Sequence, residues 1–295
     1  MLEPFGYEFF LRGMAAATLV GALCGLIGVY IVLRRMSYIG HGLSHAVFGG
    51  AVVSYVMSIN FFVGASIWGF LSALLITLTT RKRTIGADAA IGIITTASFA
   101  LGIALVSRNR TFTRDFDAAL FGNILGVSNG DLLAIALVTV GAAVIFFLGY
   151  KLFLFTTFEP DVARFYGVPT AWVDTVFSLV LAGAIVVSMQ VLGVTLIAAA
   201  IVIPPIIARL LTDSFRKLIM MSTGLGAFCG LAGIYISYYV DVSSGATIVL
   251  FSAGLFVLAI TYSNLKGRLR RRRRQSAAVP ALSGRDPVPA DFTLR

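Results

Sequence analysis

The sequence predicts an all-α fold: a polytopic bundle of transmembrane helices. The 295-residue chain has 58% hydrophobic residues, 12% charged residues and a mean hydropathy of +0.94, whereas about 25% of the residues in a soluble domain are charged. Apolar runs of about 20 residues recur between short charged breaks, and each can cross the roughly 30 Å hydrocarbon core as a helix. Because backbone groups in lipid must be hydrogen-bonded internally, helices are favoured, and the runs are too long for barrel strands.

The apolar runs place predicted crossings along most of the chain. We expect about nine crossings, with eight as the alternative if 172–209 holds one full crossing and a broken half-helix. Pro204 and Pro205 lack backbone donors, so this region is expected to be kinked or broken at the two prolines. The predicted runs are 12–33, 39–59, 61–80, 91–107, 131–153, 172–188, 190–209, 217–238 and 245–264.

Positive charge predicts the orientation, because cytoplasmic loops of membrane proteins are rich in lysine and arginine. With the N-terminus outside, most of the 23 lysines and arginines lie on the inner side, including the run KGRLRRRRR from Lys266 to Arg274. We therefore expect a multi-pass protein of the inner (plasma) membrane with a cytoplasmic C-terminus. Residues 1–265 form the predicted transmembrane domain, and 266–295 a basic, disordered tail that meets anionic lipid rather than nucleic acid.

Two segments between the runs carry further expectations. The apolar, glycine-broken stretch 115–131 is too short to span the membrane and is predicted to be a re-entrant or interfacial helix. Glu159, Pro160 and Asp161 favour the first turn of a short helix on the inner side, with Arg164 in its later part.

Glycines repeat within two of the runs and predict close helix packing, because small residues let two backbones approach. They are Gly21, Gly25 and Gly28 in the first run and Gly224, Gly226, Gly230 and Gly233 in the run 217–238.

The only two histidines of the chain lie close together, in the stretch SYIGHGLSHAVFGG. His41 and His45 are four positions apart, so both rings share one face of a helix, one turn from each other. Two imidazoles so placed can ligate a divalent ion or pass it along a path, and Ser44 adds a hydroxyl. The alternative is two histidines hydrogen-bonded to neighbouring backbone. Within a membrane, where ionisable groups mark substrate paths, the metal path is favoured.

Other polar residues near the runs are weaker candidates. Gln190 lies at an outer junction of two runs, and Asp241 lies in YVDVSSG, so either can meet an incoming substrate. Asp88 is better explained as an acidic residue at a helix N-terminus. The sequence has no G-x-x-x-x-G-K-[ST] phosphate loop and no Cys-x-x-Cys pair, so we expect a substrate path rather than an ATP-binding chain or a catalyst.

Several stretches, in order over about residues 20–260, resemble one family: the membrane permease subunits of manganese/zinc/iron-type ABC importers (the ABC-3 family). They are GLIGVYIVLRRMSYIGHGLSHAVFGG, ADAAIGIITTASFALGIALVS, FDAALFGNILGVSNGD, FEPDVARFYGVP, VLGVTLIAAAIVIPPIIARLLTD and SSGATIVL.

The resemblance implies a fold like that of the vitamin B12 and siderophore importer permeases. It implies a homodimer with the substrate path along its two-fold axis, an extracytoplasmic metal-binding protein that delivers the ion, and a separate ATPase subunit. Family permeases present a short cytoplasmic coupling helix to the ATPase, and the matching residues here run from Glu159 to Gly167.

The family's metal contact resembles an Asp-x-x-x-His pair, from which this chain departs. His45 matches the histidine, but His41 stands in place of the aspartate and Gly49 in place of a usual proline. A His/His pair offers neutral nitrogen ligands that titrate with pH. The replacement of the aspartate by His41 favours zinc or iron over manganese as the substrate. The alternative is that the metal path uses other residues.

We therefore expect a non-catalytic permease subunit that imports a divalent transition metal (manganese, zinc or iron) as substrate, with no tightly bound cofactor. The alternatives are an ABC permease for a chelated metal or a vitamin, and a secondary metal transporter that works without ATP.

Overall fold

The structure, a computed structural model, describes residues 3–81, 86–108 and 120–282, and every regular element in these ranges is a helix. The predicted all-α class is therefore confirmed. The elements in chain order are the 3-10 turn η1 (Glu3–Gly6), α1 (Glu8–Leu33), α2 (Ser37–Val56), α3 (Phe61–Arg81), α4 (Ala87–Arg108), the 3-10 turn η2 (Ile124–Gly126), α6 (Asn129–Leu148), α7 (Tyr150–Phe158), α8 (Pro160–Phe165), α9 (Thr170–Leu192), α10 (Ile197–Leu211), α11 (Phe215–Val240) and α12 (Ser244–Leu282).

The number of membrane-length helices is lower than predicted. Within the described ranges, seven helices are long and apolar enough to cross a membrane: α1, α3, α4, α6, α9, α11 and α12. Helix α2 has 20 residues, but its histidines, glycines and serines make it less apolar. Helix α10 has 15 residues and is about 22 Å long, shorter than the roughly 30 Å core. The described ranges thus hold neither the nine predicted crossings nor the alternative eight, although 172–209 does contain one long and one shorter helix.

The interruption in this region does not occur at the prolines. Helix α10 continues through Pro204 and Pro205, and the break lies earlier, at Gly193, where φ is 74°. Pro205 leaves the carbonyl of Ile201 without a helical donor. That carbonyl faces α1 at Gly28, where a Cβ would collide with it. Close packing against α1 therefore accompanies the proline pair, and the helix is not broken there.

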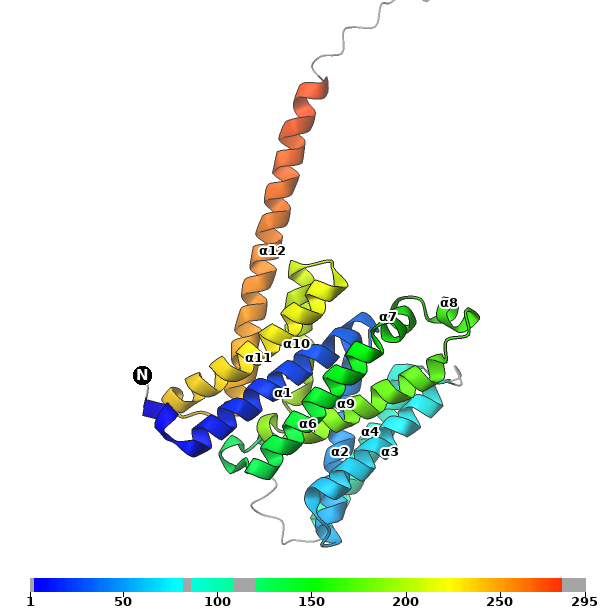
Figure 1. The fold of residues 1–295 in the computed structure, drawn as a ribbon, viewed down its shortest axis with the longest axis vertical. Coiled ribbons are helices and arrows are strands. Elements are labelled where there is room, and N and C mark those ends of the chain that lie inside the picture. Colours follow the sequence, from blue (N-terminus) through cyan, green and yellow to red (C-terminus); the bar gives the residue numbers. More distant parts are fainter. Residues whose placement is uncertain (1–2, 82–85, 109–119, 283–295) are drawn as a thin grey trace, which may run out of the picture.

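Helix α1 lies inside the bundle and contacts α6, α9, α10 and α11 (Figure 1). Two of its glycines meet α11: a Cβ at Gly21 would collide with the backbone of Gly226, and one at Gly25 with the backbone of Ser222. Gly224 differs, because the space around it is open. The predicted close approach is thus confirmed, and it fixes α1 and α11 as a pair.

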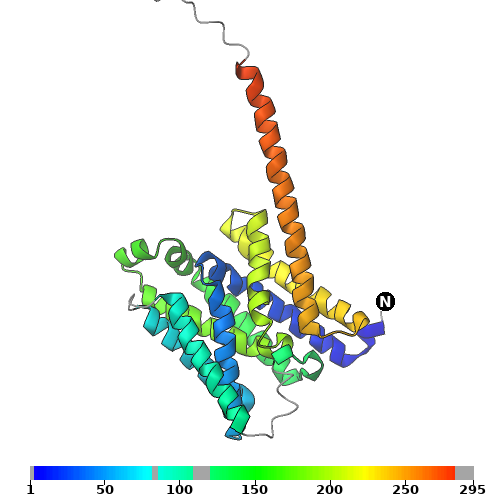
Figure 2. The same ribbon diagram turned by 180° about the vertical axis from the view of Figure 1, so that it is seen from behind.

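Helices α2, α3 and α4 form a second group, which packs against α9 and α10 (Figures 1 and 2). Helix α2 packs against both α3 and α4. A Cβ at Gly49 would collide with the Ser98 carbonyl of α4, and a Cβ at Gly42 would lie 2.6 Å from Ile91 Cγ2. Helix α2 is therefore held tightly on the side that carries its small residues.

Two predicted segments have different bounds in the structure. The run 131–153 is divided at Gly149 into α6 and α7. Of the stretch 115–131, residues 115–119 lie outside the described ranges, and the remainder holds η2, whose Ile124 is buried, and the start of α6. Ser128 and Asp131 cap α6 reciprocally, which fixes where this helix begins.

Helix α12 continues through the basic run to Leu282 and projects beyond the bundle (Figures 1 and 2). The sequence predicted that regular structure ends near residue 264, but the described backbone stays helical for about five further turns. Residues 283–295 lie outside the described ranges. The division into a transmembrane domain, 1–265, and a tail, 266–295, stays a prediction.

Candidate functional site

The two histidine rings lie together on one face of α2, as their spacing predicts. The ring centroids of His41 and His45 are 4.6 Å apart, and the ring planes are nearly perpendicular, at 84°. Both side chains are half-buried. The Nδ1 atom of His45 is buried and has no hydrogen-bond partner among the described residues. The alternative of rings hydrogen-bonded to neighbouring backbone therefore does not account for this nitrogen.

Aromatic side chains surround the pair. Phe99 of α4 packs against His45 at 4.7 Å between ring centroids, and Phe99 in turn contacts Phe48. Tyr38 lies 5.8 Å from His41, one turn towards the start of α2. These contacts place aromatic rings on both sides of the imidazole pair.

Ser44 is engaged within its own helix. Its hydroxyl donates to the His41 carbonyl at 2.8 Å, and the side chain is fully buried. In the part of the chain that the structure describes, no group of three or more His, Cys, Asp or Glu side chains could hold a metal ion. One chain thus supplies two nitrogen ligands, fewer than the three or four protein ligands of typical zinc sites.

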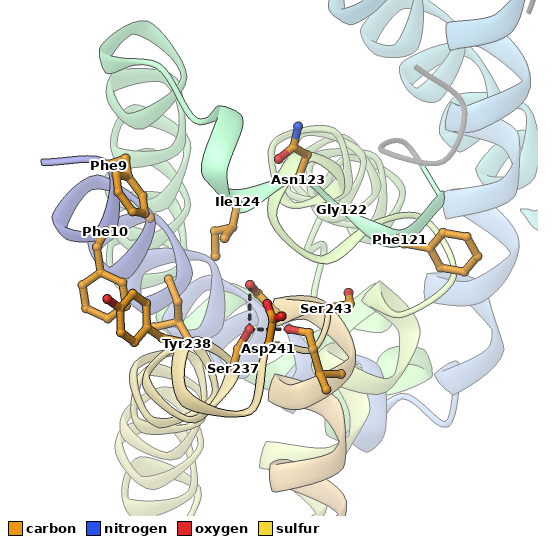
Figure 3. A pocket seen from close by; sticks show the side chains of 14 residues that line it. Phe9, Phe10, Phe121, Gly122, Asn123, Ile124, Ser237, Tyr238, Asp241 and Ser243 are labelled. Carbon is orange, nitrogen blue, oxygen red and sulfur yellow. Dashed lines mark hydrogen bonds between the residues drawn. The ribbon is translucent and has the colours of Figure 1, made fainter. Parts of the chain in front are cut away.

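Gln190 and Asp241 do not line the same cavity. Gln190 is near the end of α9, where its backbone carbonyl accepts from the Asn123 N–H at 2.9 Å. Asp241 caps the end of α11 in a left-handed conformation, with φ at 55°. It lines a cavity of about 560 Å³, together with Phe9, Asn123 and other residues, and Gln190 does not line it (Figure 3).

This cavity lies at the end of the bundle where α1 begins and α11 ends. Asn123 and Asp241 contribute polar groups, and Ser237 donates to the Val242 carbonyl at 2.6 Å (Figure 3). Neither His41 nor His45 lines it. The structure therefore does not bring Asp241 into one cavity with the histidine pair.

At the other end of α1, the predicted short helix is confirmed as α8. Pro160 occupies its first turn, where a missing N–H costs nothing. Gly167 follows the helix with φ at 78°, and the Val168 N–H bonds to the Ala163 carbonyl at 3.0 Å, which is a Schellman ending. Glu159 precedes the helix as its N-cap residue, without a side-chain cap bond. The sequence therefore specifies both ends of α8.

The surface of α8 is exposed and mixed in character. Arg164 lies 3.6 Å from Asp161, and both side chains are largely exposed. Phe165 is 86% exposed and Tyr166 73%, although aromatic side chains of this size are ordinarily buried. An exposed aromatic pair beside charged residues is typical of a surface that meets another protein.

Sequence reasoning missed a polar cluster next to this helix. Arg34, at the end of α1, forms an ion pair of 2.7 Å with Asp174 of α9. It also donates to the hydroxyls of Thr156 and Thr157, both on α7, at 3.2 Å. An arginine directly after an apolar run is normally interpreted as an orientation signal, and nothing local to it predicts partners more than 120 residues away.

A bundle of membrane-length helices with a half-buried histidine pair inside and a short, exposed helix at one end defines a membrane transport protein. Comparison with known proteins gives the family. The model of the ABC 3 transport family matches residues 6–263, and the chain belongs to this family.

Named relatives and a solved structure agree with this assignment. The manganese transport system membrane protein MntC of Halalkalibacterium halodurans is 37% identical over 94% of each chain. A probable iron transport system membrane protein of Haemophilus influenzae is 34% identical over 93% of this chain and 97% of that protein. The solved PsaBC from Streptococcus pneumoniae, in complex with Fab, is 32% identical with a TM-score of 0.77, over 86% of this chain and 91% of that chain.

Proposed function

We propose that this chain is the membrane subunit of an ABC importer that carries a divalent transition metal ion into the cytoplasm. The match of residues 6–263 to the ABC 3 transport family carries the proposal. The similar proteins named for manganese or iron transport support the class of substrate. Because their identities to this chain are close, 37% and 34%, they do not separate the two metals, and zinc stays a third possible substrate for imidazole ligands.

The histidine pair is the proposed contact for the ion. His45 offers a buried nitrogen without a hydrogen-bond partner in the described ranges, and His41 lies one turn away. Imidazole is a ligand of iron and zinc, whereas manganese favours oxygen ligands. Since His41 replaces a carboxylate expected from the family pattern, we propose a path that favours Fe²⁺ or Zn²⁺ over Mn²⁺. Ser44 supports the helix here through its backbone bond.

Two copies of the chain complete the proposed path. One chain provides two imidazoles, and in the described ranges no third His, Cys, Asp or Glu side chain forms a cluster with them. A homodimer whose two α2 helices face each other across a two-fold axis provides four nitrogen ligands. With the N-terminus outside, the cavity at Asp241 opens outward and accepts the ion from an extracytoplasmic metal-binding protein, with Gln190 further along.

The ATPase subunit is proposed to dock on α8 at the inner face. The exposed rings of Phe165 and Tyr166 supply the apolar contact, and the flanking residues Glu159, Asp161 and Arg164 supply charge. ATP hydrolysis belongs to that partner, so this chain carries no catalytic residue. In the plasma membrane, the basic extension of α12 lies against anionic lipid.

Reconstitution tests the proposed function. The full complex of permease, ATPase and metal-binding protein is placed in liposomes, and uptake of radioactive Mn²⁺, Fe²⁺ and Zn²⁺ is measured with and without ATP. We expect ATP-dependent uptake that a chelator of divalent ions abolishes, and no uptake by the permease alone. Metal flux through the permease alone would instead identify an ATP-independent transporter. Uptake of only a chelated metal would identify the other alternative.

A further inference from the structure

Arg34 joins three helices at the inner end of the bundle. It follows α1, and its guanidinium binds Asp174 of α9 through Nη1 at 2.7 Å and Thr157 of α7 through Nε at 3.2 Å. Nη2 donates to Thr156, also on α7. All three guanidinium nitrogens therefore have partners, and the planar fork fixes the relative position of α7 and α9.

The Arg34 guanidinium is largely covered and backed by an aromatic ring, whereas the Asp174 side chain is 45% exposed. The Arg34 side chain is 10% exposed, and its guanidinium carbon lies 4.7 Å from the centroid of the Phe177 ring. Phe177 contacts Tyr30 of α1, and Tyr30 stacks on Phe146 of α6 at 4.5 Å. Three hydrogen bonds and the ring of Phe177 therefore hold the Arg34 guanidinium on several sides.

Helix α8 lies in the chain between α7 and α9, the two helices that Arg34 binds. It begins two residues after α7 ends at Phe158, and α9 begins at Thr170. Arg164 of α8, Asp174 and Arg34 also line one cavity of about 330 Å³. Movement of α8 must therefore act on the last turn of α7, on the first turns of α9, or on both, and each of these contacts Arg34.

On its other side, Arg34 leads directly into α2. The turn consists of residues 34–36, in which the Met36 N–H bonds to the Ile31 carbonyl and the Arg35 N–H to the Val32 carbonyl, a Schellman ending. Arg35 occupies the left-handed position with φ at 57°, at a cost that glycine would avoid. A turn this short and this well bonded moves as a unit with the start of α2, where His41 lies.

We propose that Arg34 is a positioning residue that transmits movement of α8 to the histidine-bearing helix α2. The inference rests on the proposed function, in which α8 meets the ATPase and His41 and His45 contact the ion. In this role Arg34 touches neither nucleotide nor metal, and it determines how many ions enter for each ATP hydrolysed. When the bonds from Arg34 to α7 and α9 are lost, α8 moves and α2 does not follow.

The test measures ATP hydrolysis and metal uptake in the same liposomes, with the full complex present. In Arg34→Gln we expect ATP hydrolysis to persist while the number of ions imported per ATP falls about ten-fold, within the usual range of coupling between sites. Arg34→Lys should give an intermediate ratio, because a single ammonium group cannot hold both helices at once. The matched control is Arg35→Gln, which removes the same charge one residue away and should leave the ratio unchanged.

A second route avoids removing the buried arginine. The double variant Thr157→Val with Asp174→Asn keeps Arg34 but removes one partner on each helix, and it should lower the ratio in the same direction. If this variant and Arg34→Gln both retain the ratio of Arg35→Gln, the inference is wrong; if Arg34→Gln does not assemble, the double variant decides alone. Absence of ATP-dependent uptake in the wild-type complex would instead overturn the proposed function.

Discussion

His45 buries a ring nitrogen for which the described part of the chain supplies no hydrogen-bond partner. An unsatisfied buried polar atom costs about 1–3 kcal/mol, which an ion bound at the same lone pair would offset. His41 places a second imidazole 4.6 Å away between ring centroids. At the scale of single residues, two adjacent imidazoles thus lie against aromatic side chains of α2 and α4.

The identity of residue 41 should set the preference among metals. We expect His41→Asp to raise uptake of Mn²⁺ relative to Fe²⁺ by about ten-fold, equivalent to roughly 1.4 kcal/mol, because a carboxylate adds a hard oxygen and a negative charge. The measurement is uptake of both radioactive ions in one competition assay. His41→Asn is the control, since it has nearly the size of aspartate without the charge. Equal ratios in the two variants would contradict the role given to residue 41.

The sequence predicts some of these residue-scale features and misses others. The helical period alone places His41 and His45 on one face, because four residues make little more than one turn. The sequence does not predict that the Ser44 hydroxyl donates to the His41 carbonyl of its own helix, a bond common for serine in helices; the hydroxyl as a metal ligand stays a prediction. The pairing of Arg34 with Asp174 across 140 positions depends on the tertiary fold and has no local pattern.

At the scale of elements, the glycine pattern predicts which helices pack closely, whereas the proline pair does not locate the break. Small residues are recognisable because their effect is local: they remove side chains from a contact. A helix break depends on what surrounds it. At Pro205 the helix continues against Gly28 of α1, and at Gly193 it ends beside another segment, where a Cβ would collide with the Leu120 carbonyl.

Two glycines of α11 provide a matched pair for testing the packing of α1. We expect Gly226→Ala to lower stability by about 1–3 kcal/mol, because the added methyl group would collide with the backbone of Gly21. Gly224→Ala meets open space and should leave stability unchanged or raise it by about 0.5–1 kcal/mol through helix propensity. Thermal unfolding of the purified protein in detergent measures both. A similar decrease in the two variants would show that α11 itself, and not its contact with α1, is sensitive.

At the scale of the whole molecule, α12 joins an apolar segment to a basic one within a single helix. The helix runs from Ser244 to Leu282 and leaves the bundle (Figure 1). Hydropathy predicted where the apolar part ends but not that the helix continues, because charged residues such as lysine and arginine are also good helix formers.

The basic extension should make transport sensitive to lipid charge. We expect a chain that ends at Leu265 to assemble and to import metal in neutral vesicles, but to lose the gain that the full chain shows when anionic lipid is added. Each basic residue near such a surface contributes about 1 kcal/mol, and added salt should weaken the effect. A full-length variant with Arg270 to Arg274 replaced by glutamine separates charge from length. An equal response to anionic lipid in all three proteins would refute this role.

Helix α2 has a consequence for how the protein enters its membrane. Its glycines, serines and histidines leave it outside the group of helices apolar enough to cross a membrane alone, and insertion of a segment depends on its summed transfer free energy. The turn of residues 34–36 ties α2 closely to α1, which is among the apolar spans. We therefore expect the two helices to insert as one hairpin, so that biogenesis, as well as transport, depends on that turn.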